Sequence, residues 1–307
     1  MTPPALPPNG PRADRTGTSP DGLPPLREVI RALDIKAKKS LGQNFILDLN
    51  LTRRIARCGG PLDGLTIVEI GPGPGGLTRA LLMEGARRVI AIERDDRCLP
   101  ALEDIARAYP GRLAIQAQDA LSADWRAMLG AEPPSAVRIA ANLPYGIATR
   151  LLIGWLETTP WPPWFSGMTL RFQKEVAERI VAEPGTKAYG RLAVIAQWRT
   201  DCRIDMVLPP EAFTPAPKVA SALVEFTPRT ECLPACDVRT LGRVTAAAFG
   251  QRRKMLRTSL KALTDRPELV LEALGLSPEL RGERLTVSDF ARIAAAIDNA
   301  AQAAQPG

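Results

Sequence analysis

Histidine is absent from all 307 residues of the sequence. Imidazole is the side chain that most readily gains and loses a proton near neutral pH, and it is also a common metal ligand. Its absence excludes acid–base catalysis by imidazole and excludes metal sites that contain histidine. Any catalysis by this chain must therefore proceed without imidazole.

Cysteine is scarce, and no long apolar run is present. The five cysteines are Cys58, Cys98, Cys202, Cys232 and Cys236. Their number is odd and none forms a CxxC pair, so we expect buried or incidental thiols in a reducing compartment and no metal site. No apolar run reaches 18 residues, and the N-terminus lacks the apolar core of a signal peptide. We therefore expect no membrane span and a cytoplasmic location.

The composition is that of a basic globular protein with an unusual beginning. Hydrophobic residues make up 45% of the chain, the net charge is +7 and the isoelectric point is near 9.4, which favours a polyanionic partner. Residues 1–25 contain eight prolines among small polar residues, so we expect a disordered tail. We predict one domain over 26–230 and a small, wholly helical domain over 231–307.

Strands and helices alternate through most of the larger predicted domain. Buried strands are predicted at 66–70, 89–92, 113–117, 137–141 and 167–172. Helices are predicted from about 77 onward and at 97–108, 147–157, 174–183 and 189–198. This alternation predicts an α/β fold with a mostly parallel sheet and helices on both faces. Two further strands, 202–207 and 219–227, bracket a Pro-rich loop and predict a near hairpin at the sheet edge.

A glycine-rich loop, Gly71-Pro72-Gly73-Pro74-Gly75-Gly76, lies between the first strand and the first helix of this pattern. Ligands of open parallel sheets bind outside the carboxyl ends of strands, and glycines let the backbone approach them closely. Glu93 ends the second strand, about 20 residues beyond the loop, where a carboxylate can accept both hydroxyls of a ribose. Asp119 ends the third strand and could accept from an adenine amine. Gly71, Gly73, Glu93 and Asp119 therefore predict a nucleoside site.

Two cosubstrates contain an adenosine that such a site could bind, NAD and S-adenosylmethionine. NAD carries a pyrophosphate, but Pro72 and Pro74 remove backbone N–H groups that a pyrophosphate would need, and no G-x-G-x-x-G register fits well. S-adenosylmethionine has no phosphates and needs close approach instead. We therefore favour S-adenosylmethionine over NAD.

The tetrapeptide Asn142-Leu143-Pro144-Tyr145 follows the fourth predicted strand. An asparagine amide, carbonyls without local N–H partners beside a proline, and a flat aromatic face suit a planar base that carries an exocyclic amine. A simple strand-to-helix turn is the alternative, since Asn and Pro are common in turns. The position at the fourth of four converging strand ends favours a functional site.

These residues together resemble the ribosomal RNA adenine dimethyltransferase family. The resemblance runs from about residue 35 to 297 and includes segments outside the nucleoside site. Those segments are Gly42-Gln43-Asn44-Phe45-Ile46, Gln173-Lys174-Glu175-Val176-Ala177, the Pro209–Val219 loop and Phe249-x-Gln251-Arg252-Arg253-Lys254. It implies a Rossmann-like S-adenosylmethionine methyltransferase domain followed by a small helical RNA-binding domain. Ile46 stands where the family usually has Leu, and Gly146 follows the tetrapeptide where Asn is more usual.

Carried over by position, the resemblance implies that Asn44 and Ile46 line the S-adenosylmethionine site with Gly71, Glu93, Asp119 and Asn142. It also implies that Tyr145 and Phe213 sandwich the target adenine. The implied activity is dimethylation of the N6 amines of two adjacent adenosines in a hairpin loop near the 3′ end of 16S rRNA. The implied partner is a small-subunit (30S) precursor particle, and we expect a monomer. The alternatives are a resistance-type 23S rRNA adenine-N6 methyltransferase and an assembly factor whose methylation is secondary.

A mechanism follows as a hypothesis from the same tetrapeptide. The adenine N6 lone pair is conjugated into the ring, so the amine is a poor nucleophile. The Asn142 side-chain oxygen and a main-chain carbonyl at Leu143 or Pro144 can accept its two N–H groups and free the lone pair. Methyl transfer then depends mainly on positioning, with the adenine turned out of its stack.

Residues 249–263 are basic and predict RNA contact. The segment holds five cations and no acid, including Arg252, Arg253, Lys254, Arg257 and Lys261. A helical spacing places Arg253, Arg257 and Lys261 on one face, which a polyanion would neutralise, and places Leu256, Leu260 and Leu263 on a core face. Phosphate contacts of this kind would position the RNA and carry little sequence information.

Overall fold

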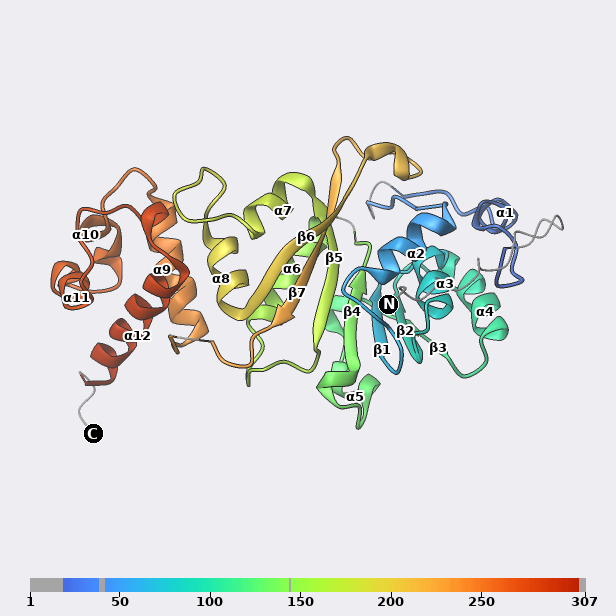
Figure 1. The fold of residues 1–307 in the computed structure, drawn as a ribbon, viewed down its shortest axis with the longest axis horizontal. Coiled ribbons are helices and arrows are strands. Elements are labelled where there is room, and N and C mark those ends of the chain that lie inside the picture. Colours follow the sequence, from blue (N-terminus) through green and yellow to red (C-terminus); the bar gives the residue numbers. More distant parts are fainter. Residues whose placement is uncertain (1–18, 39–41, 144, 233, 304–307) are drawn as a thin grey trace, which may run out of the picture. The chain divides into compact units, whose positions relative to one another are not determined.

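The computed structural model describes residues 19–38, 42–143, 145–232 and 234–303, and it divides into two compact units (Figure 1). The first unit comprises the chain up to Gly130 together with Ala212–Pro215. The second comprises Ala131–Glu211 and Ala216 onward. Residues 1–18 of the predicted tail lie outside the described residues.

The first unit contains three parallel strands in the order β3-β2-β1. They are β1 (Thr66–Ile70), β2 (Arg88–Glu93) and β3 (Leu113–Ala117). Its helices are α1 (Leu26–Ala32), α2 (Leu49–Arg57), α3 (Gly76–Met83), α4 (Leu99–Ala108) and α5 (Trp125–Leu129). Every residue of β1 is buried, as expected for a parallel strand that is covered on both faces.

The second unit contains four strands in the order β4-β5-β7-β6. They are β4 (Val137–Ala141), β5 (Gly167–Gln173), β6 (Thr200–Leu208) and β7 (Ser221–Pro228). β4 and β5 are parallel, whereas β7 runs antiparallel to both β5 and β6, which confirms the predicted hairpin. The helices between the strands are α6 (Tyr145–Leu156), α7 (Lys174–Ile180) and α8 (Arg191–Arg199).

The chain after β7 is helical, as predicted. It forms α9 (Val238–Gly250), α10 (Leu256–Ser259), α11 (Pro267–Ala273) and α12 (Val287–Ala303), coloured orange to red in Figure 1. Short 3-10 helices occur at Asp96–Cys98, Ala120–Ser122, Pro134–Ala136, Pro210–Ala212, Leu260–Ala262 and Gly282–Arg284. The core of these C-terminal helices includes Trp198 of α8 beside Leu241 and Phe290. The predicted boundary near residue 230 falls within the second unit and stays a prediction.

Residues 19–25, which we had assigned to the tail, form a turn against α3. The Asp21 carboxylate accepts two hydrogen bonds from the Arg79 guanidinium, at 2.7 and 2.6 Å, and both side chains are almost fully buried. Arg79 also donates to the carbonyl of Pro24 at 2.7 Å. This buried ion pair has its hydrogen bonds satisfied, so it attaches the end of the proline-rich stretch to the first unit.

Candidate functional site

The loop between β1 and α3 requires its glycines. Gly71, Gly73 and Gly75 have φ values of 65°, 56° and 89°, in the left-handed region that disfavours other residues. A Cβ on Gly73 would lie 3.2 Å from Cε1 of Phe45, and a Cβ on Gly75 would clash with Ile105 at 2.2 Å. The loop backbone is thus held close to its neighbours by positions that only glycine occupies without strain.

Glu93 lies at the carboxyl end of β2, beside this loop. Its Oε2 accepts a hydrogen bond from the Gly73 N–H, and its Oε1 accepts one from the Asp95 N–H, both at 2.8 Å. Burial raises the pKa of the Glu93 carboxyl, and these backbone N–H groups oppose that rise. A carboxylate offers about four lone-pair sites. Each oxygen of Glu93 can therefore still accept a ligand hydroxyl.

Asp119 lies at the end of β3 and is already engaged. Its Oδ1 accepts from the Leu121 N–H at 2.9 Å and caps the 3-10 helix that follows. Its Oδ2 accepts from Arg94 at 3.3 Å in an exposed ion pair, of a kind that contributes little stability. Asp119 remains accessible to a ligand that competes with Arg94.

The segment around Phe45 joins two parts of the predicted site. Phe45 and Thr214 form an antiparallel bridge, with N–H to O distances of 2.9 and 2.8 Å. The Asn44 side chain donates to the Pro215 carbonyl at 2.8 Å. These bonds attach Asn44 to the segment that contains Phe213. The side chain of Phe213 is buried, with 3% of its surface exposed. The side chain of Ile46 is also buried, and its carbonyl lies 3.0 Å from the position that a Cβ on Gly76 would take.

A buried acid lies below the glycine loop, and sequence reasoning gave it no role. Glu69 of β1 is 1% exposed and accepts a hydrogen bond from the Thr78 hydroxyl at 2.6 Å. Burial raises its pKa from 4.5 to about 8, against the Thr78 bond, and the charge of Glu93 adds to the rise. Glu69 therefore carries a proton at neutral pH. In the sequence it stands out as the one charged residue of the predicted strand 66–70, two positions before Gly71.

A second group that the sequence did not reveal surrounds Asp95. The carboxylate of Asp95 is 4% exposed and accepts from the Arg97 guanidinium at 2.6 and 2.9 Å and from the Gln43 amide at 2.8 Å. The Arg97 bonds hold the pKa of Asp95 at about 2, so it stays charged throughout the neutral and mildly acid range. Residue Gln43 is 52 positions away in the chain, and no local pattern links the two.

The second unit presents the tetrapeptide directly after β4. The side-chain oxygen of Asn142 is buried and accepts no hydrogen bond within the described residues. A buried acceptor without a donor costs about 1–3 kcal/mol, so this oxygen is available to a ligand N–H. The carbonyl of Leu143 accepts from the buried Arg171 guanidinium at 3.0 Å, which leaves one of its two lone pairs. Pro144 and the Tyr145 side chain lie outside the described residues.

The predicted helical face at 253–261 is wrong. Helix α9 ends at Gly250, a turn follows, and only Leu256–Ser259 is α-helical before a 3-10 turn. The N–H groups of Leu256 and Arg257 donate to the carbonyls of Leu280 and Pro278 instead of to a preceding helical turn. The predicted core positions Leu256 and Leu260 are nevertheless fully buried.

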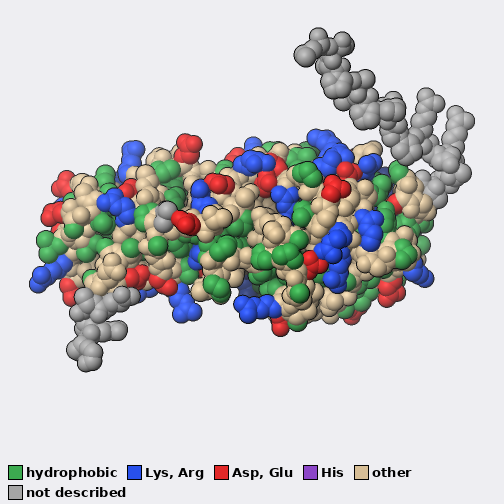
Figure 2. Space-filling view, turned by 60° about the horizontal axis from the view of Figure 1, so that its bottom comes forward, with side chains coloured by type: hydrophobic (Ala, Val, Ile, Leu, Met, Phe, Trp, Pro, Cys, Tyr) green, Lys and Arg blue, Asp and Glu red, His purple; other side chains and the backbone are tan. Residues whose placement is uncertain are grey.

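The cations of this segment differ in what holds them. Arg252 donates to the carbonyls of Lys187 and Tyr189, at 3.2 and 3.1 Å, and forms an ion pair with Glu283. All five cations are exposed, Arg252 as well as Arg253, Lys254, Arg257 and Lys261. Figure 2 shows Lys and Arg side chains spread over much of the visible face. Arg252 therefore supports the turn, while its four neighbours remain open to solvent.

Comparison with known proteins decides the family. The sequence model of the family described as "Ribosomal RNA adenine dimethylase" matches residues 34–299. The chain belongs to this family. A relative from Xanthobacter autotrophicus, called "Ribosomal RNA small subunit methyltransferase A", is 61% identical over 274 residues, covering 89% of this chain and 94% of the relative. A relative of the same description from Dinoroseobacter shibae is 59% identical over 277 residues, covering 90% of this chain and 98% of the relative.

Solved structures of low identity share the fold. A dimethyladenosine transferase from Plasmodium falciparum matches with a TM-score of 0.67 at 24% identity, over 80% of this chain and 93% of that one. The 23S rRNA methyltransferase ErmE matches with a TM-score of 0.63 at 24% identity, over 83% of this chain and all of that one. The predicted Rossmann-like α/β fold is confirmed, and the family makes the protein a methyltransferase.

The described part of the chain lacks two kinds of feature. No helix there is long and apolar enough to cross a membrane. No group of three or more Cys, Asp or Glu in the same residues is arranged to hold a metal ion. The five cysteines, all among the described residues, form no disulfide, and Cys98 is fully buried.

Proposed function

We propose that this protein transfers methyl groups from S-adenosylmethionine to the N6 amines of two adjacent adenosines in a hairpin loop near the 3′ end of 16S rRNA. The observation that carries the proposal is the buried side-chain oxygen of Asn142, which has no donor within the described residues. In a member of the ribosomal RNA adenine dimethylase family, an amine of adenine is a donor that such an oxygen can serve.

The residues of the first unit fit S-adenosylmethionine as the methyl donor. Glu93 retains acceptor capacity for both ribose hydroxyls, and Asp119 can accept from the adenine amine of the donor. The positive-φ glycines at Gly71 and Gly73 permit the close approach of a ligand without phosphates. Asn44 and Ile46 would border the same site. When bound, the donor supplies an electrophilic methyl group on a sulfonium.

The chemistry at the acceptor depends on hydrogen-bond acceptors and not on a general base. Asn142 Oδ1 takes one N6 hydrogen, and a carbonyl of Leu143 or Pro144 takes the other, so the nitrogen lone pair is freed from the ring. Arg171 occupies one lone pair of the Leu143 carbonyl and fixes its direction. The freed lone pair would be directed at the methyl group that the donor supplies, and the proton lost from N6 would pass to water. Tyr145 and Phe213 would stack on the adenine, at about 1–3 kcal/mol per base.

The RNA partner is proposed to be 16S rRNA within a 30S precursor particle, met by a protein monomer in the cytoplasm. Exposed cations of the second unit support phosphate contact: Arg253, Lys254, Arg257 and Lys261. Such contacts weaken as the salt concentration rises, because their formation releases counterions from the RNA. Arg252 would act indirectly, since it holds the turn that carries them.

The test is methyl transfer from labelled S-adenosylmethionine to purified 30S and 50S particles that lack the modification, with the labelled base mapped. We expect label only in 30S particles, as N6,N6-dimethyladenosine at two adjacent positions. Label confined to 50S particles would support the 23S rRNA alternative instead. Binding to 30S particles without methyl transfer would support the assembly-factor alternative.

A further inference from the structure

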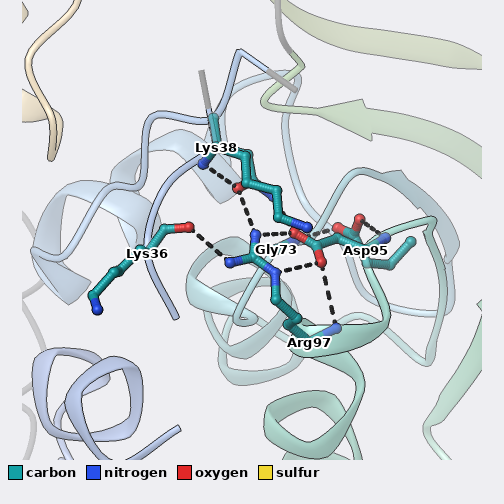
Figure 3. Close-up of polar contacts among 7 residues, drawn as sticks. Lys36, Lys38, Gly73, Asp95 and Arg97 are labelled. Carbon is teal, nitrogen blue, oxygen red and sulfur yellow. Dashed lines mark hydrogen bonds and ion pairs between the residues drawn. The ribbon is translucent and has the colours of Figure 1, made fainter. Parts of the chain in front are cut away.

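Gln43, Asp95 and Arg97 form one hydrogen-bonded cluster in the first unit. Figure 3 shows Arg97 beside Asp95, with Lys36 and Lys38 nearby. The Gln43 amide donates to Asp95, and its oxygen accepts from the Lys38 N–H at 2.9 Å and from Arg97 at 3.4 Å. Arg97 also donates to the carbonyl of Lys36 at 2.9 Å. Two positions of the segment before α2, Lys36 and Gln43, are therefore bonded to the turn that follows β2, and Lys38 is bonded to Gln43.

The cluster connects on one side to the proposed donor site. The Asp95 N–H donates to Glu93 Oε1 at 2.8 Å, and the Gly73 N–H donates to the other Glu93 oxygen. The Phe45 ring lies against Gly73, within 3.2 Å of the place of a Cβ. The segment that Gln43 anchors therefore contacts Gly73, the same loop residue that donates to Glu93.

The cluster connects on its other side to the segment that carries Phe213. Asn44, which directly follows Gln43, donates to the Pro215 carbonyl, and Phe45 exchanges two backbone hydrogen bonds with Thr214. Hydrogen bonds thus connect Glu93 through Asp95 to Gln43, and the chain itself connects Gln43 to Asn44 and Phe45, which bond to the residues beside Phe213.

We propose that Gln43, Asp95 and Arg97 are positioning residues, which hold residues 36–38 and 42–46 so that the donor site and the Phe213 segment keep their geometry together. This inference rests on the proposed function. A charge that is 96% buried is costly unless it is paired and hydrogen-bonded, and Asp95 meets both conditions through residues that belong to this segment and to its own turn. None of the three needs to touch the donor or the adenine.

The test compares three variants of the full-length protein with an exposed control pair. Arg97→Met removes the guanidinium, Arg97→Lys keeps a charge but loses the branched donor group, and Asp95→Asn removes the anion. Asp104→Asn and Arg107→Met break an exposed ion pair on α4 and serve as controls. The measurements are the dissociation constant for S-adenosylmethionine by calorimetry, the KM for donor and for 30S particles, kcat, and the melting temperature.

We expect all three cluster variants to raise the dissociation constant for the donor roughly ten- to hundredfold, the range that follows from losing a hydrogen bond to a charged group. The KM for 30S particles should rise as well, even at saturating donor, because the Phe213 segment loses its anchor. Arg97→Lys should not retain the wild-type affinity for the donor, because one ammonium cannot reach Asp95, Gln43 and the Lys36 carbonyl at once. The Asp104→Asn and Arg107→Met variants should keep the wild-type dissociation constant and both wild-type KM values.

Two results would overturn the inference. If the cluster variants lower the melting temperature but leave the dissociation constant and both KM values unchanged, the cluster only supports the fold. If Arg97→Lys restores wild-type values, charge alone matters and positioning does not. A wild-type protein that fails to bind S-adenosylmethionine would instead overturn the proposed function, which distinguishes the two failures.

Discussion

The buried carboxyl of Glu69 makes stability depend on pH in a direction that can be calculated. Its pKa is about 8 in the folded protein and 4.5 when solvated, because burial in β1 disfavours the anion. Between these values the folded state holds a proton that the unfolded state has lost. Stability is therefore greatest below pH 4.5 as far as this group is concerned, and it falls as the pH rises toward 8.

The size of the effect follows from one proton. A full proton difference changes the free energy of unfolding by about 1.4 kcal/mol per pH unit, so up to about 2.7 kcal/mol is lost between pH 5.5 and 7.5. Glu69→Gln replaces the protonated carboxyl with a neutral amide of nearly the same shape. The Thr78 hydroxyl keeps an acceptor, since the amide oxygen can take the place of Oε2.

The assay is urea unfolding of wild type and Glu69→Gln at pH 5.5, 6.5 and 7.5. The difference in free energy of unfolding between the two proteins cancels the other titrating groups. This difference should move in favour of the variant by up to about 2.7 kcal/mol across the series. Exposed Glu103→Gln on α4 provides the control. A difference for Glu69→Gln that stays constant from pH 5.5 to 7.5 would refute the argument.

Two further predictions concern the glycine loop and the basic turn. Gly73→Ala should destabilise the protein by about 1–2 kcal/mol and weaken binding of S-adenosylmethionine, since its φ of 56° is unfavourable and the added methyl group would lie 3.2 Å from the Phe45 ring. An unchanged urea midpoint and an unchanged calorimetric affinity would contradict this. Arg252→Met should lower the melting temperature by a few degrees through lost bonds to two carbonyls, whereas Arg253→Met should leave it unchanged and raise the KM for 30S particles. Equal effects of both variants in calorimetry and kinetics would show that the two arginines do not differ in role.

Much of the fold followed from local patterns in the sequence. The strands Thr66–Ile70, Leu113–Ala117 and Val137–Ala141 have the predicted bounds, because short aliphatic runs between glycine, charged and proline residues occur where parallel strands are buried. The glycine loop and the carboxylate at the end of the second strand also followed, since both are fixed by their place relative to a strand end.

The sequence-based predictions failed where contacts between distant parts of the chain determine the local structure. The segment from Arg253 to Lys261 has helical periodicity, but its backbone N–H groups find carbonyls near residue 280, so no continuous helix forms. The cluster of Gln43, Asp95 and Arg97 joins positions far apart in the chain and leaves no periodic signal. The raised pKa of Glu69 likewise depends on burial by neighbours that the sequence does not name.

The central claim is that the unpaired oxygen of Asn142 activates the adenine amine, and Asn142→Ala tests it most directly. The measurement is kcat for methyl transfer to 30S particles, made alongside the dissociation constant for S-adenosylmethionine. Loss of one acceptor that acts in the transition state should lower kcat by roughly 10²–10³-fold while the donor still binds. Near wild-type kcat with normal donor binding would contradict the account.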